Sequence, residues 1–187
     1  MESTVRLSLT AIVWVLIAEV PARLLQRLEA VRAQLSVRAR TDALTGLSNR
    51  HDLPHALDAL LPGDAVVLLD LDHFKAFNDE RGHQAGDAVL VRFGLLLEQS
   101  VRASDLAFRY GGEEFLLLLG HTPPVDAEGL VKRTAARWAE ESELTFSAGI
   151  AVVDADGDAH QALTQADTAP YAAKGAGRNT SRVFEPR

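Results

Sequence analysis

Apolar segments of strand length recur along the chain after residue 41. The expected strands are residues 65–71, 106–110, 113–120 and 144–153. The first of them, AVVLLDL, is a nearly continuous apolar run, which is typical of a strand covered on both faces. Gly111-Gly112 separates the second strand from the third and predicts a hairpin turn.

Helix-like segments alternate with these strands. The expected helices are residues 51–61, 87–99, 125–141 and 160–174. In the second of them, apolar residues at 89, 90, 93, 96 and 97 follow the helical repeat. Residues 39–49 contain Thr, Gly and Asn and are expected to form a loop, and GAGRN at 175–179 is expected to end the last helix. The pattern predicts an α+β fold with one mostly antiparallel sheet flanked by helices.

Residues 1–40 differ from the rest and are expected to form an N-terminal helical arm, with a second domain over 41–187. Residues 7–18 carry no charge, but this run is shorter than the roughly 20 residues that span a bilayer. A heptad-like stripe follows at Leu24, Leu28, Val31 and Leu35. A buried or dimerising helix, with a coiled coil as its extension, is the favoured interpretation. A membrane-adjacent remnant is the alternative.

The net charge and the amino-acid composition exclude or disfavour several classes of function. The formal net charge is −7, with +3 in residues 1–40 and −10 in the remainder. An acidic domain disfavours a general nucleic-acid binder, because phosphate backbones need Lys and Arg surfaces. The chain has no cysteine, which excludes disulfides, thiolate metal sites and a cysteine nucleophile. A cytoplasmic location is expected, near a membrane if the chain is part of a larger receptor.

Acidic residues follow the strand at 65–71. Asp70 and Asp72 lie at its end, and we expect them to point to opposite sides, one toward a site and one toward the protein. A carboxylate beside a main-chain carbonyl offers hard oxygen ligands suited to Mg²⁺. The alternative is that both residues cap the next helix.

A second acidic pair follows the two-glycine hairpin. Glu113 and Glu114 come directly after Gly111-Gly112, where backbone can approach a ligand closely. If neighbouring strands end in Asp70 and Glu113, two carboxylates can share one metal, as phosphoryl or nucleotidyl transfer requires. The alternative is an ordinary hairpin with solvated acids.

Two cations end the last expected helix. Lys174 and Arg178 are four residues apart and could hold a polyphosphate. The alternative is a helix C-terminus with favourable cations and a glycine stop.

Five motifs in this order resemble the GGDEF diguanylate cyclases, in the GGEEF variant. They are DALTGLSNR (42–50), DLDHFKAFND (70–79), GHQAGD (82–87), RYGGEEF (109–115) and YAAKGAGRN (171–179). The resemblance covers roughly residues 40–184 and implies a nucleotidyl-cyclase, palm-like fold with a ferredoxin-like core. It also implies a head-to-head homodimer that joins two GTP molecules into cyclic di-GMP and releases two pyrophosphates. The 3′-hydroxyl of each GTP would attack the α-phosphate of the other.

The resemblance also implies residue roles. Asp70, Glu113 and the Leu71 carbonyl would bind Mg²⁺, for which Mn²⁺ can substitute, and Glu114 would complete the catalytic acidic group. Whether Glu113 or a metal-bound hydroxide removes the 3′-hydroxyl proton stays open. The substrate contacts would come from Phe74, Lys75, Asn78, Asp87, Gly111, Gly112, Lys174 and Arg178.

Asp87 favours GTP over ATP, because its carboxylate can accept from guanine N1–H and N2–H₂, which adenine lacks. Arg102 and Asp105 match the family's RxxD motif for inhibition by product, and Arg133 falls where some relatives place a second arginine. Pro170 departs from the family pattern and could kink the helix before Lys174. It is the one feature that favours a non-catalytic module that binds GTP or cyclic di-GMP.

Overall fold

The computed structural model describes residues 40–156, 158–175 and 181–184, together with Arg23, and within 169–175 it describes the backbone only. From Arg40 onward the chain forms one compact unit. The expected helical arm, with its stripe of Leu24, Leu28, Val31 and Leu35, lies outside the described residues. Among the residues that are described, no helix is both long enough and apolar enough to cross a membrane.

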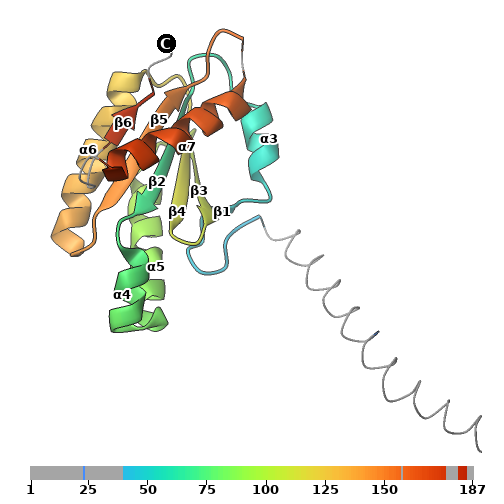
Figure 1. The fold of residues 1–187 in the computed structure, drawn as a ribbon. Coiled ribbons are helices and arrows are strands. Elements are labelled where there is room, and N and C mark those ends of the chain that lie inside the picture. The colour runs from blue at the N-terminus through green and yellow to red at the C-terminus, as the bar shows by residue number, and fades with distance from the viewer. Residues whose placement is uncertain (1–22, 24–39, 157, 176–180, 185–187) are drawn as a thin grey trace, which may run out of the picture. The chain divides into compact units, whose positions relative to one another are not determined.

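The described strands form one six-stranded sheet in the order β1-β3-β4-β2-β5-β6 (Figure 1). They are β1 (Ser48–Asn49), β2 (Ala65–Leu71), β3 (Leu106–Gly111), β4 (Glu114–Leu119), β5 (Phe146–Val152) and β6 (Ser181–Val183). The four inner strands pair antiparallel, and the short edge strands β1 and β6 pair parallel to their neighbours. The expected α+β fold with a mostly antiparallel sheet is confirmed.

Helices pack on both faces of this sheet. They are α3 (Leu53–Asp58), α4 (Phe74–Arg81), α5 (His83–Ser100), α6 (Pro124–Glu141) and α7 (Ala159–Gly175). The sequence pattern predicted all of them except α4, and it missed β1 and β6. The sequence of α4 is mostly polar, and the two edge strands are only two and three residues long, so none of the three carries a readable apolar repeat. Gly82, at φ 83°, separates α4 from α5.

Alternate residues of the strands supply two cores. On one face, Leu69, Phe115 and Phe146 pack against α5 and α6, and Phe93 of α5 lies at the centre of this core. The Phe93 ring centroid lies 5.0 Å from that of Phe115 and 4.9 Å from that of Trp138. On the other face, Leu68 and its neighbours pack against α3 and α7. Because β2 is buried on both faces, it has the continuous apolar sequence that predicted it.

Helix α7 continues past Pro170 and ends at Gly175. Proline fixes φ near the helical value, and its main cost inside a helix is one lost backbone hydrogen bond and local crowding. The segment is nevertheless helical up to Lys174, as the sequence analysis expected for residues 160–174.

Candidate functional site

Asp70 and Glu114 lie directly opposite each other, where β2 ends and β4 begins. Directly opposite residues in a sheet point to the same face. The previous pair on this face, Leu68 and Leu116, belongs to the core beneath α3 and α7. The fold therefore places two half-buried acidic residues opposite each other at one end of the β2–β4 pair.

The register pairs Asp70 with Glu114 rather than with Glu113, which the sequence analysis had placed beside Asp70. Glu113 lies in the turn just before β4, and its carbonyl accepts a hydrogen bond of 3.3 Å from the Leu71 N–H. Glu114 points back over the hairpin, since its Oε2 lies 3.7 Å from where a Cβ on Gly111 would be. The two glutamates thus occupy different positions around one hairpin.

Asp72 is buried and accepts hydrogen bonds from residues at the start of β5 and just before it. The expectation that Asp70 and Asp72 face opposite sides is wrong, because residues two apart along a strand share a side. Asp70 lies opposite Ser147 in the β2–β5 ladder, and Asp72 reaches the same Ser147, whose hydroxyl donates to Oδ1 at 2.9 Å. The Thr145 hydroxyl donates to the other oxygen at 2.8 Å. Asp72 is only 1% exposed, so it ties β2 to β5 rather than facing a ligand.

The loop after β2 turns sharply into α4. His73, at φ 59°, adopts the left-handed conformation immediately before the helix. The Phe74 side chain is 6% exposed and belongs to the core under α5, so only its backbone can contact a ligand. Lys75 is exposed at the first turn of α4. The loop thus presents backbone N–H groups and one lysine beside the Asp70 strand end.

Asn78 and Asp87 come from two helices that pack against each other. Asn78 lies on α4 against Gly86 of α5, and a Cβ at Gly86 would collide with the Asn78 side chain. Within the described part of the chain, the buried Asn78 Oδ1 has no hydrogen-bond partner. Asp87, the next residue after Gly86, is exposed. The α4–α5 contact therefore places Asn78 against Gly86, the residue that precedes Asp87.

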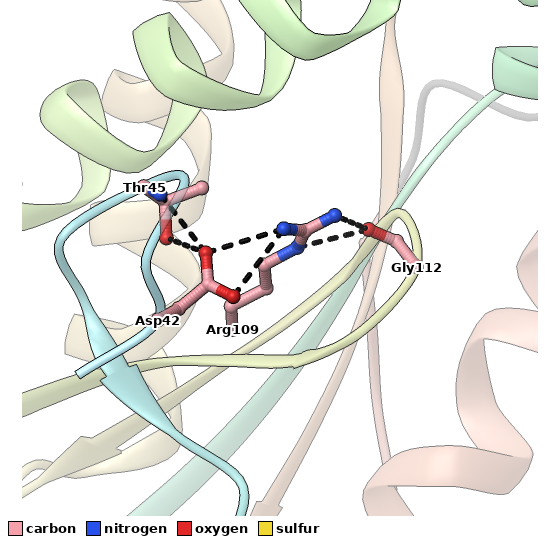
Figure 2. A network of polar contacts seen from close by, with 4 residues as sticks. All are labelled: Asp42, Thr45, Arg109 and Gly112. Carbon is pink, nitrogen blue, oxygen red and sulfur yellow. Dashed lines mark hydrogen bonds and ion pairs between the residues drawn. The ribbon is translucent and has the colours of Figure 1, made fainter. Parts of the chain in front are cut away.

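An ionic network connects the turn at residues 42–47 to the hairpin (Figure 2). The Arg109 guanidinium donates to both Asp42 oxygens, at 3.2 and 3.4 Å, and to the Gly112 carbonyl, at 2.9 and 3.1 Å. Asp42 Oδ1 also accepts from the Thr45 N–H and hydroxyl. Burial alone would raise the pKa of Asp42, but the hydrogen bonds from Thr45 and Arg109 outweigh burial and hold that pKa below its ordinary value.

The expected cations are only partly described. Lys174 lies in the last turn of α7, where the backbone alone is described, and Arg178 lies outside the described residues. The α7 helix packs on the sheet face that carries Asp70 and Glu114, through Ala162 and Ala166. The course of α7 is thus compatible with a cation near these carboxylates.

The RxxD residues lie at the opposite end of the hairpin strands. The Asp105 carboxylate accepts from the backbone N–H groups of Arg102, at 3.0 Å, and Gly120, at 3.2 Å. Both residues line a groove of about 320 Å³ between the turn at 41–48 and the α5–β3 connection. Arg133 is exposed on α6, a separate element. The structure therefore brings Arg102 and Asp105 together and leaves Arg133 apart from them on its own helix.

The donor atoms at the Asp70 end fit a divalent cation. Two carboxylates and the adjacent Leu71 carbonyl are the oxygen ligands that Mg²⁺ prefers. No group of three His, Cys, Asp or Glu suited to a metal occurs among the described residues. Mg²⁺ commonly uses one or two carboxylates together with substrate phosphates and water, so the acidic residues at this strand end, Asp70, Glu113 and Glu114, are of the type that it binds.

Sequence reasoning missed the roles of Asp42, Thr45 and Arg109. All three lie within motifs that carried the family resemblance, but nothing in the local pattern indicates that residues 67 positions apart form an ion pair. The signal available was two short motifs, DALTG and RYGG, each containing one charged residue and at least one glycine.

Comparison with known proteins agrees with this arrangement. Residues 39–180 match the family model described as diguanylate cyclase, GGDEF domain. The chain is 42% identical over 159 residues to the response regulator PleD of Caulobacter vibrioides, covering 75% of this chain and 35% of PleD. It is 35% identical over 161 residues to the diguanylate cyclase DgcS of Shewanella oneidensis, covering 80% of this chain and 54% of DgcS.

A solved structure shows the same fold. The coiled coil and GGDEF domain of DgcB from Caulobacter crescentus, in complex with c-di-GMP, superposes with a TM-score of 0.75 at 27% identity. The match covers 89% of this chain and 96% of that one. The chain spans about one third to one half of the length of the curated relatives named above. On the family match, the shared motifs and the common fold, this chain belongs to the GGDEF domain family of diguanylate cyclases.

Proposed function

We propose that this chain is a diguanylate cyclase that condenses two GTP molecules into cyclic di-GMP and releases two pyrophosphates. The observation that carries the proposal is the register that places Asp70 opposite Glu114, next to the Gly111-Gly112 hairpin. Opposed carboxylates at a strand end, beside backbone open to a ligand, suit the transfer of a nucleotidyl group.

Asp70, Glu113 and the Leu71 carbonyl would hold the divalent cation, expected to be Mg²⁺ with Mn²⁺ as a substitute. Glu114, which lies opposite Asp70 in the ladder, would complete the acidic group. When bound, the cation would offset charge on the triphosphate. Glu113 would also be placed at the hairpin to accept the 3′-hydroxyl proton of the attacking GTP.

The rest of the substrate would lie along α4 and the hairpin. The Phe74 amide, Lys75, Lys174 and Arg178 would bind the triphosphate, and Gly111 and Gly112 would leave room for the α-phosphate. Asn78 and Asp87 would accept from the N1–H and N2–H₂ of guanine. Asn78 packs against Gly86, the residue before Asp87, so both residues come from the same α4–α5 contact.

The reaction needs two GTP-loaded domains facing each other, so the active form would be a homodimer, with residues 1–40 as its dimerising helix. The related DgcB structure contains a coiled coil together with its GGDEF domain. Such an arrangement predicts that specific activity rises with protein concentration.

Arg102 and Asp105 would form a site where cyclic di-GMP inhibits the enzyme, with Arg133 supplied from the facing domain. The Asp105 carboxylate is already held by two backbone N–H groups, and the Arg102 side chain is exposed next to it. Such an ordered acceptor beside a guanidinium suits a guanine edge and a phosphate.

The test is GTP turnover with Mg²⁺, with products separated by chromatography, for wild type and the Glu113→Gln variant. We expect cyclic di-GMP from wild type and a loss of at least about 100-fold in the variant. Glu128→Gln on α6, which removes a surface ion pair with Lys132, is the matched control and should behave as wild type. Tight GTP binding without turnover in the wild-type dimer would contradict the proposal and indicate a binding module.

A further inference from the structure

The hairpin that carries Glu113 is held from outside the β2–β4 pair. Arg109 uses the Nε and one terminal nitrogen of its guanidinium to donate twice to the Gly112 carbonyl, and its other terminal nitrogen donates to Asp42 (Figure 2). Both side chains of the ion pair are largely buried, with 17% of Arg109 and 23% of Asp42 exposed. The carbonyl is thus fixed by a planar fork that is itself fixed by a carboxylate.

The Gly112 carbonyl belongs to the same peptide group as the Glu113 N–H. Because a peptide group is planar, fixing the direction of the carbonyl oxygen also fixes the Glu113 N–H and the position of the Glu113 Cα. Gly112 has φ 45°, a left-handed conformation that other residues rarely adopt. The orientation of this peptide therefore depends on a glycine at position 112.

We propose that Arg109 and Asp42 are positioning residues that orient the peptide between Gly112 and Glu113 and so aim the Glu113 carboxylate. The inference rests on the proposed function for its consequence in catalysis. The peptide on the other side of Glu113 is held as well, since its carbonyl accepts from the Leu71 N–H. Glu113 is therefore fixed through both of its peptide groups, by β2 on one side and by Arg109 on the other.

The turn at residues 42–47 holds Asp42, and through it Arg109, in place. Thr45 donates two hydrogen bonds to Asp42, at 2.9 and 2.8 Å, and packs against α5 at Gly94, where an added Cβ would lie 3.0 Å from the Thr45 Cβ. Next to Arg109, Tyr110 packs under Arg50, whose guanidinium carbon lies 4.7 Å from the ring centroid. Residues 42–50 thus hold the last two residues before Gly111.

The experiment compares Arg109→Lys, Arg109→Ala and Asp42→Asn with wild type in the full chain. Arg109→Lys keeps the positive charge but loses the planar fork, so it separates orientation from charge pairing. Arg137→Lys on α6 is the matched control, because Arg137 also makes a guanidinium hydrogen bond, to Gln99 at 3.1 Å, away from the hairpin. The readouts are kcat and KM for GTP per folded molecule and the amide exchange rate of Leu71.

We expect both Arg109 variants to lose about 10- to 100-fold in kcat with little change in KM, as a misplaced catalytic group does. Asp42→Asn should lose less, and Arg137→Lys nothing. The Leu71 amide should exchange faster in the Arg109 variants, because the Gly112–Glu113 peptide, which adjoins the Glu113 carbonyl that Leu71 donates to, is no longer held.

An Arg109→Lys variant with wild-type kcat would overturn the inference, as would losses that follow only the folded fraction. If the wild-type chain turns over no GTP, the proposed function fails, and the amide exchange rate of Leu71 is then the only test of the positioning role. An unchanged exchange rate in Arg109→Lys and Asp42→Asn then overturns the positioning role, and faster exchange supports it. Should Arg109→Ala fail to fold, these two variants carry the test.

Discussion

The two ends of the β2–β4 pair use carboxylates in opposite ways. Where β2 begins, Asp64 is buried, and its two oxygens accept from the backbone N–H groups of Leu61 and His121, each at 2.8 Å. Where β2 ends, Asp70 and Glu114 lie opposite each other in the ladder. An acidic residue thus accepts backbone hydrogen bonds at one end of the strand pair. At the other end, two acidic residues lie opposite each other.

This difference separates structural acids from functional ones. A buried carboxylate that accepts backbone N–H groups is satisfied by the fold and adds to its stability. Asp70 and Glu114, which lie opposite each other and are only half-buried, are instead at a strand end where their oxygens can face a ligand. Asp72 belongs to the first kind, although it lies only two residues from Asp70, because two hydroxyl groups donate to it.

The largest effect should come from the functional end. Glu114→Gln removes one of the two opposed charges, and we expect turnover to fall by at least about 100-fold. The melting temperature should change little, because Gln keeps the shape of Glu and the side chain is only half-buried. Turnover assays and thermal unfolding of the same preparations check this. If Glu114→Gln were inactive because it had unfolded, Glu114 would be a structural residue like Asp64, and the proposed contrast between the two ends would be wrong.

The opposite pattern is expected at the structural end. Asp64→Asn replaces one acceptor oxygen with an NH₂ group that faces a backbone N–H, so the free energy of unfolding should fall by about 1–3 kcal/mol. Turnover per folded molecule should not change. Urea denaturation and activity at matched folded fraction test this. A large loss of kcat without loss of stability would place Asp64 in the functional class.

A smaller effect concerns the cation. Mg²⁺ at tenfold excess over its dissociation constant should stabilise the wild-type chain by about 1.4 kcal/mol. We expect Asp64→Asn to keep this increment and Glu114→Gln to lose most of it. Thermal unfolding with and without Mg²⁺ measures both. Equal increments in the two variants would contradict the assignment of the metal to the Asp70 end.

The smallest effect should appear in the pH dependence of stability. The pKa of Asp42 is lowered in the folded state, so its contribution is complete above the unfolded pKa of about 4 and is lost as pH falls through the folded value. Asp42→Asn should therefore cost about 1 kcal/mol near pH 7 and progressively less as pH falls below about 4. Denaturation of both proteins across this range is the measurement. A difference that stays constant with pH would show that the charge of Asp42 contributes nothing.

Much of the fold could be predicted because buried strands and helices leave a recognisable pattern of apolar residues in the sequence. The apolar run at 65–71 and the helical repeats in α5 and α6 gave these elements correctly, and α7 was predicted even with Pro170 inside it. The elements that were missed, β1, α4 and β6, are short or polar and form through contacts with the rest of the sheet and with α5. The site was predicted less completely, because its motifs are readable but the direction of each side chain is not.

The sequence by itself determined the family, the order of the motifs and the hairpin at Gly111-Gly112, because these depend on local residue types and spacing. Only the tertiary structure decided that Glu114 rather than Glu113 lies opposite Asp70, since a shift of one residue in register moves every side chain to the other face. It also decided that Asp72 is structural and that Asp42 reaches Arg109 across 67 positions. Local pattern specifies which groups are present, whereas register and packing specify which of them meet.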